Sequence, residues 1–405
     1  MKKLFHTLLI TAAVGAALPV AAQEEADSTA ENKGFRFTDV VTVPATPVKD
    51  QSKSGTCWSF SGVGHLESEI LKNGGKETDL AEMFAVRQVY LDKAKKYMRL
   101  GGQANFGPGG AVTDVLYVAA NYGLLPQEAY PGINYGEEKH THGELDAAIE
   151  AYVKAVNRHP NRRLSTAWEK GLEGILDAYL GEVPQTFTVD GKTYTPHTYA
   201  ASLGIDVDAY IPVTSFTHHP YYTQFPLEVS DNWLWANYYN VELDELQQIV
   251  DNALEQGYTV VWAADVSEPG FKWKKGVALM PADIDENDLE GTELARWVAL
   301  TPEEKKKDKY EFSGPVAEEN ITPETRQQWF DRMETTDDHG MLIVGKAVDD
   351  EGNPYYKVKN SWGADNHIYD GYLYVSMPYF RAKTLSLLVN KKALPKQVAS
   401  KLNIK

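Results

Sequence analysis

Apolar residues recur every three or four positions after Cys57, which is the spacing of a helix with one buried face. This set comprises Phe60, Val63, Leu66 and Ile70. Asn73-Gly74-Gly75 is typical of a helix end, and the small polar run at 52–56 is suited to a turn. The pattern therefore predicts a helix that begins at Cys57 and ends just before Asn73.

Other segments predict a mixture of helices and strands. Residues 78–99 and 111–122 have amphipathic helical patterns, and Thr78 is the expected cap of the first. Residues 243–255 predict a helix before the apolar strand YTVVWAAD, and Thr322-Pro323 begins another helix. Asp190-Gly191 predicts a hairpin within TFTVDGKTYT. This mixture favours the α+β class.

A second hairpin follows from the segment DDHGMLIVGKAV. His339 opens the apolar run 341–344, the turn DDEGNP follows, and YYKVKNSWG reads as the partner strand. Because His339 begins one strand and Asn360 ends the other, the hairpin brings these two residues together. An asparagine carbonyl that accepts the imidazole N–H would select one tautomer, and Trp362 would shield that hydrogen bond from water.

Composition and charge restrict the function. With 405 residues, 43% of them hydrophobic and 24% charged, the chain has the composition of a soluble protein with two or three substructures. Lys and Arg total 40 against 57 Asp and Glu, a formal net charge of −17. This charge repels phosphate backbones, so we expect no nucleic-acid partner. Peptide substrates and a possible homo-oligomer remain as partners.

The first residues have the pattern of an export signal. Lys2 and Lys3 precede an apolar run at 4–18, and Val20-Ala21-Ala22 provides the small residues of a cleavage site. We therefore expect a signal peptide at 1–22, a flexible leader at 23–34, and a periplasmic or secreted protein. The run is short for a membrane span of about 20 residues, so no membrane association is expected after cleavage.

Cys57 is the only cysteine, so it cannot close an internal disulfide. It is a core residue, an intermolecular link or a nucleophile. The start of a helix favours the thiolate through its partial positive charge and free amides, so we expect a thiol pKa well below the ordinary value of about 8.5.

The other histidines have plainer interpretations. We expect His140 and His142 to be solvated loop residues, and His218-His219 to lie in an aromatic-rich turn. The run that begins at Asp283 resembles a calcium loop but lacks its glycine and its final acidic ligand. The sequence therefore predicts no metal and no cofactor.

Two segments carry a family resemblance. PVKDQSKSGTCWSFSG and the HG…KNSWG…GY half resemble the papain-like cysteine peptidases, and the chain is most similar to their bleomycin hydrolase and aminopeptidase C branch. The resemblance implies a two-lobed fold with a helical lobe at 35–134 and a β-barrel-like lobe at 331–395. A large mixed insertion at 135–330 and a tail at 396–405 complete the expected organisation.

The resemblance also implies roles for individual residues. Cys57 would be the nucleophile, His339 the base, Asn360 the residue that orients it, and Gln51 an oxyanion donor. The expected substrate contacts are Gly109, Gly110, Asp338 and Trp362.

The expected function is an exported cysteine peptidase that forms an acyl-enzyme, with an aminopeptidase favoured over an endopeptidase with an open cleft. A peptide-binding protein without catalysis and an acyl transferase are the remaining alternatives. The tail that ends at Lys405 is shorter than the arm that meets the substrate amine in that branch. The insertion would therefore have to supply the block and an acidic anchor, or the cleft would admit internal bonds.

Overall fold

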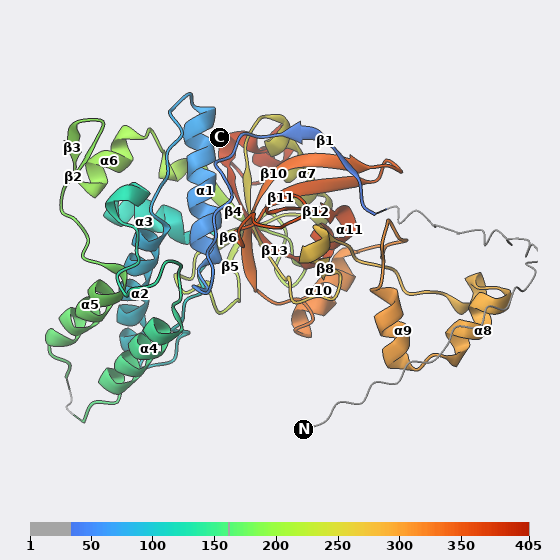
Figure 1. The fold of residues 1–405 in the computed structure, drawn as a ribbon, viewed down its shortest axis with the longest axis horizontal. Coiled ribbons are helices and arrows are strands. Elements are labelled where there is room, and N and C mark those ends of the chain that lie inside the picture. The colour runs from blue at the N-terminus through green and yellow to red at the C-terminus, as the bar shows by residue number, and fades with distance from the viewer. Residues whose placement is uncertain (1–33, 161–162, 405) are drawn as a thin grey trace, which may run out of the picture.

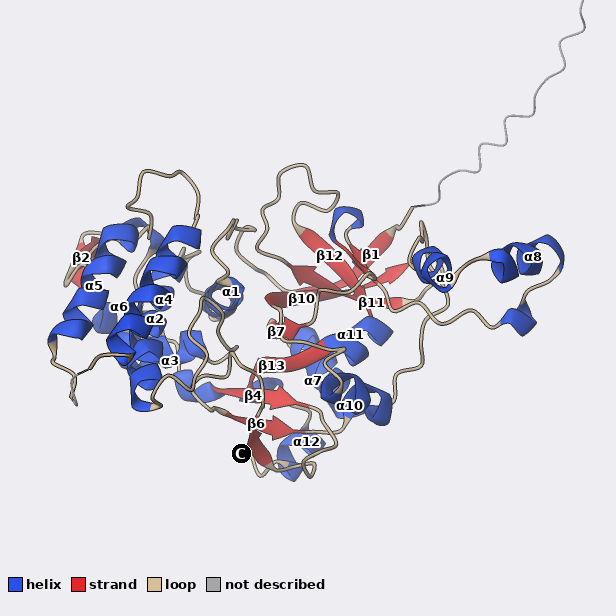
Figure 2. Cartoon of the chain, turned by 90° about the horizontal axis from the view of Figure 1, so that it is seen from below, coloured by secondary structure: helices blue, strands red, loops and turns tan. Residues whose placement is uncertain are grey.

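The structure is a computed structural model that describes residues 34–160 and 163–404. Figure 1 shows two lobes, a group of helices and a large mixed sheet, with helix α1 (Cys57–Lys72) along their boundary. Figure 2 shows the same arrangement from below, with α1 between the helices and strand β10. The described residues thus confirm the predicted α+β class.

The helical lobe begins with α1 and α2 (Glu82–Arg99) and continues through segments close to them in the chain. These are α3 (Asp114–Tyr122), α4 (Gly143–Asn157), α5 (Ala167–Leu180), the hairpin β2 (Phe187–Val189) and β3 (Lys192–Tyr194), and α6 (Pro196–Ser202). The hairpin turns at Asp190 and Gly191, both with positive φ, as predicted.

Helix α2 starts later than the sequence predicts, and Thr78 is not its cap. The Thr78 hydroxyl donates to the carbonyl of Lys76, while Ala81 is the N-cap. The Leu80 amide donates to the buried Glu67 carboxylate and the Ala81 amide to the carbonyl of Leu125. These partners outside the helix hold residues 78–81 extended.

The sheet lies in the order β5-β6-β4-β13-β7-β10-β11-β12-β9-β8, and β1 pairs with β10. Its strands are β1 (Phe37–Thr42), β4 (Tyr210–Thr214), β5 (Gln224–Pro226), β6 (Asn237–Asn240), β7 (Val260–Ala264), β8 (Phe271–Lys272), β9 (Val277–Ala278), β10 (His339–Asp349), β11 (Pro354–Lys359), β12 (Tyr372–Ser376) and β13 (Thr384–Asn390). The helices that accompany the sheet are α7 (Leu243–Glu255), α8 (Gly291–Ala299), α9 (Pro302–Lys309), α10 (Pro323–Asp331), α11 (Met377–Lys383) and α12 (Lys396–Lys401).

The segment 135–330 does not form a body of its own. Its helices α4 and α5 pack against α2, and its strand β7 lies between β10 and β13. His339 at the start of β10 pairs with Ala264 of β7. Residues predicted to lie between the two halves of the site therefore supply the strand that supports His339.

Apolar cores cover both faces of the sheet. One joins Leu66 of α1 and Val89 of α2 to Leu342 of β10, and the other joins Ile249 of α7 to Ile343 of β10. Alternate residues of β10 point to opposite faces, as expected for a central strand. The strand that begins with His339 is thus fixed on both faces.

A buried group of charges joins the two lobes behind α1. Lys49 Nζ lies 3.1 Å from Glu67 of α1 and 2.5 Å from Glu82 of α2. Glu67 also accepts from Thr46 Oγ1 at 2.5 Å, and Lys359 of β11 donates to the same hydroxyl at 3.1 Å. Both glutamate side chains are almost completely buried, so each depends on Lys49 for a compensating charge.

Replacement of Lys49 by methionine is expected to lower the free energy of unfolding by about 3–5 kcal/mol, because it leaves two buried carboxylates without their cation. Denaturant unfolding followed by circular dichroism measures this loss. Lys76→Met is the matched control, since Lys76 pairs with Asp190 on the exposed surface and its loss should leave stability unchanged. Equal stability of both variants would contradict the proposed role of the buried pairs.

Candidate active site

Cys57 is the first residue of α1, as predicted, and the residue as a whole is half-buried. The preceding Thr56 is fully buried and makes no side-chain bond to the helix amides. The backbone N–H of Gly340 donates to Cys57 Sγ at 3.2 Å. A side chain at Gly340 would crowd α1, because a Cβ there would lie 2.9 Å from Ser61 Oγ. Glycine therefore lets β10 approach the thiol.

The hairpin of β10 and β11 brings His339 and Asn360 together. His339 Nε2 lies 2.7 Å from Asn360 Oδ1, an oxygen that also accepts from the Ser361 amide at 2.8 Å. Because Oδ1 is an acceptor, Nε2 carries the proton and Nδ1 is left with a lone pair in the neutral ring. The Trp362 ring lies 4.7 Å from the imidazole and covers it, although 36% of Trp362 is exposed.

Gln51 is held by the segment that follows Asn360. The Ser361 hydroxyl donates to the side-chain Oε1 of Gln51 at 2.6 Å, and the backbone N–H of Gln51 donates to the Ser361 carbonyl at 2.8 Å. Since Oε1 is the acceptor, the Nε2 group of this buried side chain is left to donate elsewhere. The Gln51 side chain therefore has a defined orientation.

The glycine pair lies under a loop from the sheet lobe. Lys93 Nζ donates to the Gly109 carbonyl, and a Cβ on Gly109 would overlap the carboxylate of Asp231. A Cβ on Gly110 would lie 2.7 Å from Asp114 Oδ2. Asp231 belongs to the β5–β6 loop (227–236), whose Trp233 donates to Asp114 at 2.7 Å. Gly109 is therefore required for the close approach of this loop, whereas Gly110 is required for the packing of Asp114 and Trp58 within the helical lobe.

Asp338 contacts a different loop. Its carboxylate accepts from the Ser267 amide at 3.0 Å and from the Thr336 hydroxyl at 2.8 Å. These bonds lower the pKa of Asp338 although burial acts in the opposite direction. The predicted substrate contact of Asp338 stays a prediction.

Two acidic residues that the sequence analysis missed lie near the thiol. The charges of Asp337 and Asp231 both act on Cys57 and oppose its ionisation. Burial, together with Asp231, Asp338 and Asp114, raises the pKa of Asp337 to about 7. No sequence pattern links position 231 to position 337, because only the fold brings the β5–β6 loop to the cleft.

The prediction for His140 and His142 is wrong. Both side chains are buried, and their rings lie 5.6 Å apart in an edge-to-face arrangement. The backbone N–H of His142 donates to the carbonyl of Lys53 at 3.0 Å. The backbone N–H of Lys53 in turn donates to the carbonyl of His140 at 3.0 Å. Backbone pairing with the segment before Cys57 thus draws this polar loop into the protein.

Burial disfavours the charged form of Cys57 and of His339, the candidate catalytic pair, when each is considered by itself. It raises the pKa of the Cys57 thiol to about 12, against the lowering effect of the Gly340 amide, so the low thiol pKa expected from the helix start is wrong for the thiol by itself because burial outweighs the amides. It lowers the pKa of His339 to about 4, against the raising effect of Asn360. The family resemblance implies that a proton passes from Cys57 to His339, which would create both charges together and let each stabilise the other.

The two lobes, with the Cys57 thiol at the start of α1 and the His339–Asn360 pair on the sheet, define a papain-like cysteine peptidase. The chain belongs to this family, as the resemblance implied. The papain family cysteine protease model matches residues 36–166, and the model of the peptidase C1-like family matches residues 315–405.

Relatives match the chain over most of its length. "Cysteine proteinase 1, mitochondrial" of Saccharomyces cerevisiae is 23% identical and covers 90% of this chain and 79% of its own. "Aminopeptidase C" of Lactobacillus delbrueckii subsp. lactis is 23% identical and covers 88% of this chain and 82% of its own. The crystal structure of PepW from Lactobacillus rhamnosis shares the fold, with a TM-score of 0.66, 18% identity and coverage of 90% and 84%.

Replacement of His339 by glutamine is expected to slow alkylation of Cys57 by iodoacetamide at neutral pH at least about tenfold, because the buried thiolate loses its charged partner. The wild-type protein should already react fully below the ordinary thiol pKa of about 8.5, and the variant only above it. Labelling rates across pH, followed by mass spectrometry, measure both. His197→Gln, at an exposed position, is the control, and coincident curves for wild type and His339→Gln would refute the ion pair.

Proposed function

We propose that the protein is a cysteine aminopeptidase that uses Cys57, His339, Asn360 and Gln51. Cys57 Sγ attacks the carbonyl carbon of the first peptide bond, and the imidazolium of His339 protonates the leaving amine. The thioester that remains is hydrolysed by water, which gives up its proton to His339. The released products are an amino acid and the shortened peptide.

The arrangement of His339 supports this role. Asn360 Oδ1 accepts a hydrogen bond from Nε2–H of His339, so Nδ1 is the nitrogen that exchanges a proton with the thiol and the leaving group. The backbone N–H of Gly340, the residue after His339, donates to Cys57 Sγ, so the chain at His339 runs beside the sulfur.

The orientation of Gln51 supports a place in the oxyanion hole. Ser361 occupies Gln51 Oε1, so the Nε2 group and the backbone N–H of Cys57 are the donors proposed for the developing oxyanion. One such donor contributes about 3 kcal/mol to transition-state stabilisation in comparable sites.

The position of Asp231 is the observation that carries the aminopeptidase assignment. The β5–β6 loop crosses to the helical lobe, where Asn105 donates to Asp231 Oδ1 at 3.0 Å and Lys96 stacks on Trp235. The loop brings a carboxylate onto Gly109, where a longer substrate would have to continue. Because Asp231 adds a carboxylate at this end of the cleft, a substrate with a free ammonium group is favoured there.

The tail does not provide this charge in the described residues. Helix α12 packs against α7 through Lys401, which lies 2.6 Å from Glu245, and Val398 is buried in the core behind the sheet. The loop at 227–236 therefore replaces the tail as the proposed anchor.

We also propose export, with peptides as the partners and the periplasm or the exterior as the location. The support is the sequence pattern at 1–22, which lies outside the described residues. Among the residues that the structure does describe, no helix combines the length and apolarity that a membrane span requires. N-terminal sequencing of the native protein is expected to begin at or near Gln23, and an intact Met1 would contradict export.

Catalysis should depend on Cys57 and on Gln51 to different degrees. Cys57→Ala should abolish peptide hydrolysis, whereas Gln51→Ala should lower kcat by about 10²–10³ because one oxyanion donor is lost. Steady-state kinetics on an aminoacyl amide, with folding checked by circular dichroism, measure these effects. Unchanged kcat in Gln51→Ala would remove this residue from the oxyanion hole.

The exopeptidase assignment is tested by substrates with a free or an acetylated amine. We expect Asp231→Asn to lower kcat/KM for the free amine about 10- to 100-fold, since a charged hydrogen bond contributes about 1.5–3 kcal/mol. Asp350→Asn changes the net charge equally at an exposed turn and should have no effect. Equal cleavage of acetylated substrates by the wild type would make the protein an endopeptidase.

A further inference from the structure

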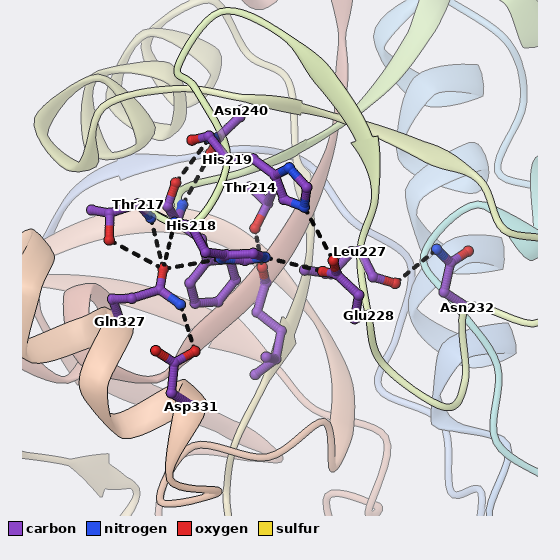
Figure 3. Close-up of polar contacts among 12 residues, drawn as sticks. Thr214, Thr217, His218, His219, Leu227, Glu228, Asn232, Asn240, Gln327 and Asp331 are labelled. Carbon is purple, nitrogen blue, oxygen red and sulfur yellow. Dashed lines mark hydrogen bonds and ion pairs between the residues drawn. The ribbon is translucent and has the colours of Figure 1, made fainter.

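A cluster of two histidines and a glutamate lies outside the catalytic groups, in the loops that follow β4 and β5. Figure 3 shows His218 and His219 side by side, with Glu228 facing both rings. His218 Nε2 lies 3.1 Å from Glu228 Oε2, and His219 Nε2 lies 3.1 Å from Glu228 Oε1. One ligand atom from each residue lies within 4.8 Å of the others. All three side chains are accessible to solvent, so a dissolved ion has a route to them.

Gln327 of α10 determines which nitrogen of His218 faces the carboxylate. Gln327 Oε1 accepts from the backbone amides of Thr217 at 2.7 Å and His218 at 3.2 Å, so this atom is an oxygen acceptor. It also lies 3.1 Å from His218 Nδ1, which must therefore carry a proton. Asp331 holds the other end of the same amide by accepting from Gln327 Nε2 at 2.8 Å (Figure 3).

This hydrogen bond leaves a mismatch at the other side of the ring. In a neutral His218 the Nε2 atom has a lone pair, and that lone pair points at a carboxylate oxygen 3.1 Å away. Two acceptors at hydrogen-bond distance repel each other unless a cation lies between them or the imidazole takes a second proton. A metal ion at this point would bind both atoms.

The loop is also rigid around the two imidazoles. The His219 ring stacks on Phe225 with 4.1 Å between centroids, and the Phe330 ring stacks on His218 at 6.0 Å. The fully buried Asn240 donates to the carbonyls of Phe216 at 2.8 Å and His219 at 2.9 Å. The donor atoms are thus positioned by packing and by hydrogen bonds that do not involve the ligand.

We propose that His218, His219 and Glu228 bind a divalent transition-metal ion, and that Zn²⁺ is the ion that these donors suit best. Two imidazole nitrogens and one carboxylate oxygen are a common zinc set, with water in the fourth position. Ligands about 2.0–2.1 Å from a tetrahedral Zn²⁺ lie about 3.3 Å apart, close to the two separations observed here. Gln327 would act as the outer hydrogen-bond partner that orients a metal-bound histidine.

The proposed ion would join two segments of the sheet lobe. His218 and His219 follow β4, whereas Glu228 lies at the start of the β5–β6 loop. The site lies apart from the catalytic groups, because none of its residues contacts Cys57, His339 or Asn360 among the described hydrogen bonds. Its expected effect is on the stability of the loop.

Zinc binding to the full-length Cys57→Ala variant tests the site, because this background removes the one thiol that competes for zinc. Titration against a chromophoric chelator should give about one zinc ion per chain. Glu228→Gln and His219→Ala should each weaken binding at least about 100-fold, and His197→Ala, at an exposed position elsewhere, should leave it unchanged. The melting temperature of the parent should rise with zinc and that of the two ligand variants should not.

The role of Gln327 provides a second test. Gln327→Leu should weaken zinc binding about 10- to 100-fold, the usual effect of losing an outer-shell partner. Gln327→Glu combined with Asp331→Asn keeps an acceptor for Nδ1–H and a donor–acceptor pair between positions 327 and 331, so this double variant should bind like the parent. X-ray absorption of the zinc-loaded parent should show two imidazole ligands, whatever the stability of the variants. Absence of binding at micromolar zinc, or binding that survives Glu228→Gln and His219→Ala, would overturn the proposal.

Discussion

The buried carboxylates of Glu67 and Glu82 are the constraint around which the two lobes are arranged. Each belongs to a helix of the helical lobe, and both depend on Lys49 for a compensating charge. Burial raises the pKa of Glu82 to about 7, while Lys49 lowers it. Lys49 lies two residues before Gln51, so the ion pair that keeps α1 and α2 together also positions the start of the cleft.

The same network reaches the sheet at the residue before Asn360. Lys359 donates to Thr46, which donates to Glu67, so β11 is connected to α1 through two hydrogen bonds. Cys57 lies at the start of α1 and Asn360 directly after Lys359. Cys57 and the partner of His339 therefore lie on elements that one connected group of buried polar contacts holds together, and a shift of either lobe would disturb both.

The β5–β6 loop links the peptidase site to the proposed metal site. Glu228 lies near its beginning, Asp231 reaches Gly109, and Trp233 bonds to Asp114 in the helical lobe. Loops of this kind tolerate variation, whereas the strands on either side keep their pairing. In the proposed aminopeptidase this one loop of the sheet lobe determines how much of a peptide enters the cleft, while Cys57 lies on a helix and His339 on a central strand.

Local pattern alone was sufficient for the helix at Cys57 and for the pairing of His339 with Asn360. Helical periodicity and a hairpin turn act over short separations, so the sequence determined that the thiol begins a helix and that imidazole and amide meet. The assignment of Gln51 rested on the family resemblance, and the structure supplied the Ser361 contact that orients it. Only tertiary structure decided the rest. Because Leu80 and Ala81 donate to Glu67 and Leu125, α2 begins at Glu82 instead of near Thr78. Backbone pairing with Lys53 draws His140 and His142 into the protein. The placement of Asp231, of β7 beside His339, and of Gln327 against His218 joins residues far apart in the chain. No local pattern encodes such contacts, because their energy comes from packing between lobes and strands that exists only once the chain has folded.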